Sequence, residues 1–231
     1  KVNFPVGIKV IGNESFRSLT SLAIEDLQLP NLTSLGQNAF YGVKIKKISD
    51  LGNITALPGG STSTQNFGDK SVLEEIVLPE TIISIPNGSL FKYTNCVIED
   101  LNLPNLSSLG GGAFNGTKLR KISSLGNITA LPVDSNNTGG VFSNCTSLEN
   151  VYYNGTIEDW CNIFFYNYMS NPMYPAEHFF IKDSNEQFYE LTNLQLQDVD
   201  GRIGAYQFYG FDCLEHLEIL DGITKVPSFA F

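Results

Sequence analysis

Apolar residues recur along the chain in the pattern apolar-x-x-apolar-x-apolar, in which x is mostly polar or charged. Clear examples are residues 73–78, 98–103 and 214–219. The last two apolar positions alternate with a period of two, which is typical of a short β-strand with one buried face. Pro79 and Pro104 directly follow two of these segments and end the strand, because proline has no N–H to donate to a neighbouring strand.

These segments belong to longer repeats. Residues 24–58 and 98–132 are identical at 26 of 35 positions, at an offset of 74 residues. A shorter period lies within this unit, because an apolar residue is repeatedly followed five positions later by Phe. Successive Phe residues of this series are 24, 27, 24, 23 and 28 positions apart, which is the length of a leucine-rich repeat. The series comprises Phe16, Phe40, Phe67, Phe91, Phe114 and Phe142, and Phe208 has the same spacing from Ile203.

We therefore predict a repeat solenoid that is mainly β, a right-handed coil of about eight short-strand leucine-rich repeats. Each coil should contain two short strands and a turn. One coil cannot bury its own apolar face, so coils should stack at about 4.8 Å, the spacing of neighbouring strands. We expect the Phe side chains of the series to be nearly fully buried in one stacked row, because burying each contributes about 1.5–3 kcal/mol.

Two stretches resemble the BspA-type leucine-rich-repeat family, also called the treponemal type. Residues 73–91 read LEEIVLPETIISIPNGSLF, and residues 105–122 read NLSSLGGGAFNGTKLRKI. The family repeat runs roughly L-x-x-I-x-I-P, then V-x-x-I, then A-F-x-x-C-x-x-L. The resemblance implies a curved solenoid on the surface of gut or oral bacteria or of some parasitic protists. It also implies adhesion to host proteins or to other cells, and no catalytic site.

The resemblance leads us to predict a single solenoid domain over residues 1–231. Its repeats should lie at about 8–153 and 191–231, with a variant insertion at 152–190. The chain starts at Lys1 and not at Met, and it stops inside a repeat. We therefore interpret it as a fragment of a longer chain whose targeting segment was removed.

The insertion has its own expected elements. Residues 154–165 are typical of a short helix, which Thr156 can cap. Residues 178–191 indicate a β-hairpin around a turn at 183–186.

Composition limits the range of partners. The 231 residues carry a formal net charge of -10, and the pI is about 4.6. Nucleic-acid binding needs a basic face, so we expect no nucleic-acid partner and no docking on anionic lipid. No run of about 18 apolar residues occurs, so the sequence predicts no insertion into a membrane.

The sequence offers little support for catalysis, and we expect no enzyme, no cofactor and no metal site. Cys161 and His178 could pair as nucleophile and base, but no nucleophile signature surrounds them, so packing is the favoured interpretation. Residues 198–201 read DVDG, like part of a calcium loop, but the closing Glu is missing and a turn is favoured.

The four cysteines are expected to be free thiols. Cys96 and Cys145 lie two coils apart, about 10 Å from the strand spacing. A disulfide needs Cα atoms within about 7 Å. Disulfides remain the alternative, since they are common in secreted chains.

Two groups of side chains are candidates for binding a partner. The polar strand positions of two successive coils bring Glu74, Glu75, Glu99 and Asp100 together. Neighbouring coils offer bases, so exposed ion pairs of about 0.2–1 kcal/mol each are the favoured interpretation. The alternative is a patch that holds a cation or a basic partner.

The second group comes from the insertion, which is rich in aromatic residues. Packing as a satellite core is favoured, and an aromatic binding patch is the alternative. The candidates are Tyr152, Tyr166, Tyr168 and Tyr174, because tyrosines offer large contact area with few rotatable bonds. We expect the contact surface to combine the strand face with residues 152–190.

The sequence thus favours a non-catalytic, cell-surface or secreted protein-binding module, such as an adhesin that contacts host or neighbouring-cell proteins. The alternative is a structural spacer or stalk that presents other domains of a longer surface protein. We expect an extracellular or cell-surface monomer with a protein partner, for example a host extracellular protein.

Overall fold

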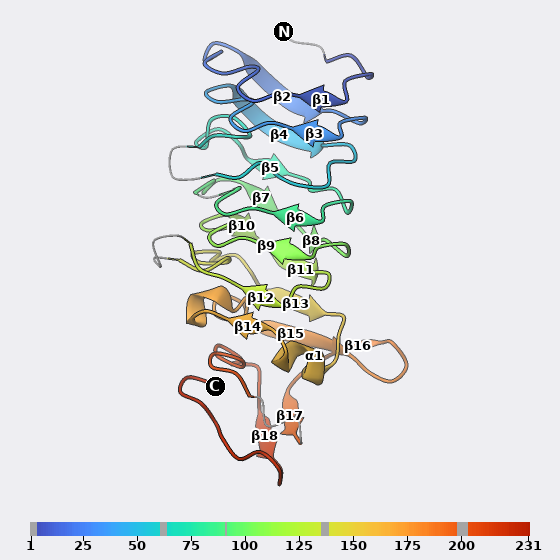
Figure 1. Ribbon diagram of the computed structural model, residues 1–231, viewed down its shortest axis with the longest axis vertical. Coiled ribbons are helices and arrows are strands. Elements are labelled where there is room, and N and C mark those ends of the chain that lie inside the picture. Colours follow the sequence, from blue (N-terminus) through green and yellow to red (C-terminus); the bar gives the residue numbers. More distant parts are fainter. Residues whose placement is uncertain (1–3, 61–63, 91, 135–138, 198–202) are drawn as a thin grey trace.

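The computed structural model describes residues 4–60, 64–90, 92–134, 139–197 and 203–231. Its coils stack into an elongated body, with the N-terminus at one end and the last strands at the other (Figure 1). Short strands dominate and helix is scarce among the described residues. The predicted mainly β repeat solenoid is therefore confirmed, while the number of repeats stays a prediction.

One side of the stack, here called the main face, is formed by strands of successive coils. These strands pair in parallel, so each coil is hydrogen-bonded to the next one along the chain. Two five-stranded sheets share this face and run into each other, because only Arg120 separates β10 from β11. The main-face strands are β2 (Ala23–Gln28), β4 (Lys44–Asp50), β5 (Glu75–Ile76), β7 (Val97–Ile98), β8 (Leu101–Asn102), β10 (Lys118–Leu119), β11 (Lys121–Ser124), β13 (Asn150–Tyr153) and β15 (His178–Lys182).

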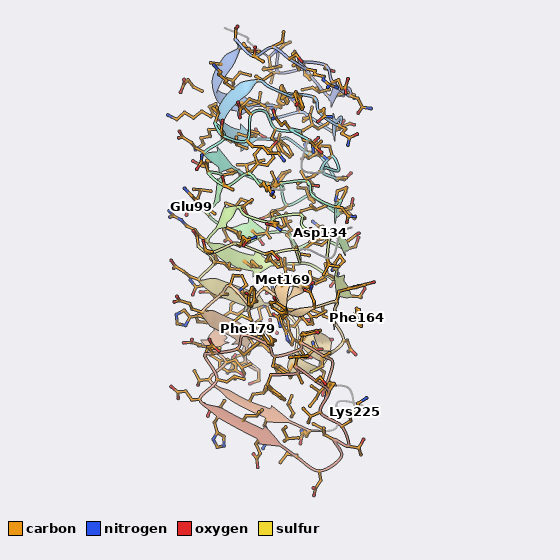
Figure 2. The ribbon with its side chains drawn as sticks, turned by 90° about the vertical axis from the view of Figure 1, so that its left-hand side faces the viewer. Glu99, Asp134, Phe164, Met169, Phe179 and Lys225 are labelled. Carbon is orange, nitrogen blue, oxygen red and sulfur yellow. The ribbon has the colours of Figure 1, made fainter. Side chains whose placement is uncertain are left out.

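The other side, here called the second face, carries two-residue strands that also pair in parallel. They are β1 (Val10–Ile11) with β3 (Ser34–Leu35), β6 (Ser84–Ile85) with β9 (Ser108–Leu109), and β12 (Ala130–Leu131) with β14 (Phe164–Phe165). Figure 2 shows Glu99 of the main face and Phe164 of the second face on opposite sides of the body. The core lies between the two faces, and the apolar positions of the sequence pattern, such as Leu101 and Leu103, point into it and are fully buried.

The predicted burial of the Phe series is confirmed for most of its described members, and ring stacking is present in two pairs of them. Phe40, Phe67, Phe114 and Phe142 are fully buried. Phe114 and Phe142 stack with ring centroids 5.9 Å apart and planes 2° from parallel. Phe208 is also buried.

Two members of the series, Phe16 and Phe91, are not in this buried group. Phe16 is only half-buried, because it lies near the N-terminal end, although its ring stacks on Phe40. Phe91 lies outside the described residues. Its neighbour Leu90 is fully buried, and the Leu90 N–H donates to the Ala113 carbonyl oxygen. The Phe16 N–H donates to Ala39 in the same way, so Leu90 occupies the equivalent position of its coil.

The helix and hairpin expected in residues 152–190 are present. Helix α1 (Ile157–Cys161) starts at Thr156, which exchanges capping hydrogen bonds with Asp159. Strand β15 turns back into β16 (Phe188–Glu190), and the Asp183 N–H closes the turn on the Gln187 carbonyl oxygen at 2.9 Å.

Both strands of this segment continue the stack. Strand β14 pairs in parallel with β12, and β15 pairs in parallel with β13. The helix and the hairpin are therefore additions to a stacked coil. The 3₁₀ helix η1 (Tyr168–Ser170) follows β14, and Asn171 ends it by accepting the Met173 N–H at 2.9 Å.

The main sheet is interrupted after the hairpin. Antiparallel β16 lies along the edge of β15 where the strand of the next coil would pair. Strands β17 (Asn193–Leu196) and β18 (His216–Ile219) therefore form a separate parallel pair. Leu194 and Leu196 of β17 are buried, whereas their partners Leu217 and Ile219 in β18 are each 41% exposed. Strand β18 thus leaves its apolar side chains uncovered.

All four cysteines are free thiols, as expected. Cys96, Cys145 and Cys161 are buried, and Cys213 is partly exposed. Burial raises the pKa of the thiol to about 12 at each of the three buried residues. These thiols are therefore neutral near pH 7 and chemically quiet.

We expect the folded protein to react slowly with a thiol reagent at pH 7.5, with Cys213 reacting first. In denaturant without reductant, all four cysteines should react, because unfolding exposes them and restores an ordinary thiol pKa. The measurement is a colorimetric thiol count in native and in denaturing buffer. A count of two or zero in denaturant would reveal a disulfide and contradict the free-thiol state.

Candidate partner-binding surfaces

Charged side chains form a ladder on the solvent side of the main face. Lys47 Nζ lies 2.8 Å from Glu75 Oε1, and Lys46 Nζ lies 3.8 Å from Glu74 Oε2. The hydrogen bond to Glu75 is the largest influence on Lys47 and raises its pKa. Asp26, in the preceding coil, accepts a hydrogen bond from the Ser49 hydroxyl at 2.8 Å.

The ladder repeats in later coils. Arg120 Nη1 lies 3.2 Å from Glu99 Oε2, and Lys121 Nζ lies 3.4 Å from Asp100 Oδ2. Ser123 donates to Asp100 at 2.7 Å, which reproduces the bond from Ser49 to Asp26 one repeat unit earlier. The ion pairs predicted between acidic and basic coils are therefore present on both sides of the four acids.

This pairing bears on the cation alternative for Glu74, Glu75, Glu99 and Asp100. Each of the four carboxylates already has a basic partner within 4 Å. In the described part of the chain, no group of three or more His, Cys, Asp or Glu side chains is arranged to hold a metal ion. The ladder is consequently a nearly neutral surface of alternating sign.

Tyr152 continues this surface with aromatic rings. Its ring stacks on Phe180 with centroids 4.5 Å apart, and Phe188 meets it edge-on at 5.1 Å. Lys121 Nζ lies 4.9 Å from the centre of the Tyr152 ring, so the charged ladder and the aromatic rings are in contact here. We call Tyr152, Phe180 and Phe188 the main-face aromatic patch. Tyr189 pairs with the buried Ile181, so its ring points to the other side of the sheet.

The other candidate tyrosines lie elsewhere on the coil. Tyr166 packs edge-on against Phe164 at 4.9 Å, at the end of a second-face strand, and both rings are more than half exposed. Tyr168 contacts Tyr174 at 4.9 Å and Tyr209 at 5.4 Å, at the turn that follows η1. The structure therefore divides the tyrosines into separate groups, and Tyr152 alone shares the main face with the acids.

Sequence reasoning missed Phe180, Phe188 and Tyr209 as surface neighbours of the candidates. The first two could have been found from the predicted hairpin, since its alternating positions place Phe180 beside Tyr152 on the same face. Tyr209 belongs to a later coil, and the sequence has no local signal that aligns it with Tyr168.

The residues considered for catalysis are apart. His178 Nδ1 lies 2.6 Å from Glu190 Oε1 on the main face. Cys161 is a buried residue of α1. Among the described residues, no hydrogen bond, ion pair or ring contact links the two. Residues 198–201, considered as a calcium-like turn, lie outside the described residues.

Two solved structures align with almost the whole chain. The chain aligns over 95% of its length with 54% of a leucine-rich repeat protein from Bacteroides ovatus ATCC 8483, at 17% identity and a TM-score of 0.43. It aligns over 97% of its length with 71% of a leucine-rich repeat protein from Eubacterium ventriosum ATCC 27560, at 12% identity and a TM-score of 0.36. The chain thus spans about half the length of the first. No curated protein matches it.

Within the described residues, no helix has the length and apolar character needed to cross a bilayer. The model of the BspA type leucine rich repeat region matches residues 1–64, 60–172 and 178–231. These matches include most of the segment at 152–190, in agreement with the pairing of β14 and β15 inside the stack. The chain therefore belongs to the BspA-type leucine-rich-repeat family.

Proposed function

We propose that this chain is a non-catalytic protein-binding module of a secreted or cell-surface protein, and that it acts as an adhesin. Leucine-rich repeat families of this kind are generally non-catalytic repeat modules that bind proteins or belong to surface proteins. We further propose that its partner is a host or neighbouring-cell protein, that it lies outside the cell, and that it is a single-domain monomer.

The observation that carries it is the main face. A parallel sheet holds its side chains in fixed rows, so few rotamers are lost when a partner binds. The ladder presents acidic and basic side chains to a partner, and complementary charges favour specificity more than affinity. The main-face aromatic patch adjoins this ladder, and exposed aromatic rings are enriched among residues that contribute most to binding. Phe188 is 39% exposed, and Tyr152 is partly exposed.

The test is surface plasmon resonance with the whole chain and a panel of host extracellular-matrix and plasma proteins. For any ligand found, the Tyr152→Ala/Phe188→Ala double variant should weaken binding at least about tenfold, since it removes two rings that lie on the solvent side of the main face. Charge reversal by Glu74→Lys/Glu75→Lys tests the acidic rungs, and a basic partner should bind that variant less well.

The matched control is the Tyr166→Ala/Tyr168→Ala double variant, which removes two aromatic rings away from the main face. Binding that this variant weakens, while the Tyr152/Phe188 variant leaves it intact, would move the contact to the second face or the η1 turn. If no main-face variant changes the affinity and all variants remain folded, the proposed contact surface is wrong.

A spacer role is the second candidate, and the elongated stack in Figure 1 favours it. A stalk needs length and rigidity and no ligand. Failure of the whole chain to bind any member of the panel would favour this second function.

A further inference from the structure

One seven-residue sequence occurs twice in the chain, in two different surroundings. Residues 52–58 and residues 126–132 both read Gly-Asn-Ile-Thr-Ala-Leu-Pro. The turn at 79–81 of the following coil covers the first copy. In the coil that follows the second copy, helix α1 occupies the place of that turn. The two copies therefore compare two surroundings with the local sequence held constant.

The first copy is closed. The Thr81 hydroxyl donates to the Ile54 carbonyl oxygen at 2.8 Å, and the Ile83 N–H donates to the Thr55 carbonyl oxygen at 2.7 Å. Ile54 is fully buried, and Leu51 is 1% exposed. A hydroxyl group of the protein thus completes the hydrogen bonding of this segment.

The second copy is open. The Phe164 N–H donates to the Thr129 carbonyl oxygen at 2.9 Å, so the strand pairing is the same as in the first copy. Among the described residues, however, no group donates to the Ile128 carbonyl oxygen, and Ile128 and Leu125 are each 7% exposed. A cavity of about 330 Å³ lies here, lined in part by Ile128 and Thr129.

The rest of the lining is polar and carries little charge. Asn127, Thr129 and Asn162 line the cavity with side chains that have no hydrogen-bond partner among the described residues. Tyr153 adds its ring and a hydroxyl that is likewise without a partner there, and burial raises its pKa, so the hydroxyl stays a neutral donor. Asp159 contributes a carboxylate, of which Oδ2 is engaged in capping α1.

We propose that this cavity binds a sugar residue, and that a hydroxyl of the sugar donates to the Ile128 carbonyl oxygen as Thr81 does to Ile54. Amides, hydroxyls and a carbonyl beside an aromatic ring match a neutral ligand with many hydroxyl groups. The volume lies at the small end of ligand pockets, which suits a mono- or disaccharide unit. This site is separate from the main-face aromatic patch and does not depend on the proposed protein binding.

The test is a titration of the whole chain with glucose, galactose, mannose and N-acetylglucosamine. Isothermal calorimetry should show saturable binding of at least one sugar in the millimolar range. Trp160, the single tryptophan, lies 5.1 Å from the Tyr153 ring, so the same sugar should change the tryptophan emission. Absence of binding by all four sugars would overturn the proposal.

The repeated sequence supplies the control variants. Asn127→Ala should raise the dissociation constant at least about tenfold, which is about 1.4 kcal/mol. Thr129→Phe should abolish binding by filling the cavity. Asn53→Ala and Thr55→Phe make the same changes in the closed copy and should leave the dissociation constant unchanged. Equal loss in both pairs of variants would overturn the site, as would unchanged binding by Asn127→Ala and Thr129→Phe.

Discussion

Replacing Trp160 with alanine is expected to lower the free energy of unfolding by about 3–5 kcal/mol, because the largest side chain of the core is lost. Trp160 is 1% exposed, and its ring contacts Phe179 at 4.9 Å and Phe211 at 5.7 Å. Its indole N–H donates to the Gln207 carbonyl oxygen at 2.8 Å, and the Gln207 side chain donates back to the Trp160 carbonyl oxygen. The ring thus joins α1 to a later coil.

The measurement is urea unfolding followed by circular dichroism, since the alanine variant has no tryptophan emission. Trp160→Phe is the matched control. It keeps an aromatic ring and removes the N–H donor, so we expect a smaller loss, of about 1–2 kcal/mol. The Asn171 side chain also donates to Gln207 O, at 3.3 Å, which limits that loss. Equal effects of the two substitutions would contradict the central role of ring packing.

Phe114→Ala should also cost about 3–5 kcal/mol. The Phe114 ring is fully buried and stacks on Phe142, in the middle of the array. Each coil contacts mainly its neighbours, so a cavity here weakens both adjoining interfaces. Unfolding should then show a lower midpoint, and amide exchange should speed up most in the adjoining coils.

Phe16→Ala tests the same residue type at the N-terminal end. Phe16 is half-buried, and it stacks on Phe40. We expect a clearly smaller loss of stability than at Phe114, with faster exchange confined to the first coils. If the two variants lose equal stability, the row of aromatic rings is not the source of the effect.

The fold could be predicted well from the sequence because each coil repeats the same pattern of apolar and polar positions. The five-residue spacing from an apolar residue to Phe correctly located the buried Phe40, Phe114 and Phe208. Phe91, which lies outside the described residues, is adjacent to a second apolar residue, Leu90. Residue type alone does not choose between the two, whereas the hydrogen bond from the Leu90 N–H to the Ala113 carbonyl oxygen places Leu90 at the position that Phe16 has in its coil.

The coil that contains α1 was harder to recognise. Its strands are separated by a helix and by η1, so the period of the array is lost, although β14 and β15 keep their places in the ladders. Strand pairing depends on the neighbouring coil, and a linear pattern does not contain that information.

The candidate surface shows the same limit. The alternation of charges along the chain correctly predicted the ion pairs of Glu75 and Glu99, because adjacent strands bring equivalent positions together. The tyrosines were predicted as one patch, but a coil turns several times between Tyr152 and Tyr174. Their number and type can be read from the sequence, but the side of the coil that each tyrosine occupies cannot.

The equivalence of the two repeat copies has a consequence for the gene. A crossover between the DNA segments that encode residues 24–58 and 98–132 would delete or add 74 residues in one step. Deleting residues 50–123, for example, joins Ser49 to Ser124, and most of the side chains that meet at the new junction are those that already meet in the present array. The bonds from Ser49 to Asp26 and from Ser123 to Asp100 show that the strand segments of the two copies make the same contacts. The length of such an array can therefore change by whole coils between descendants without a period of unstable intermediates.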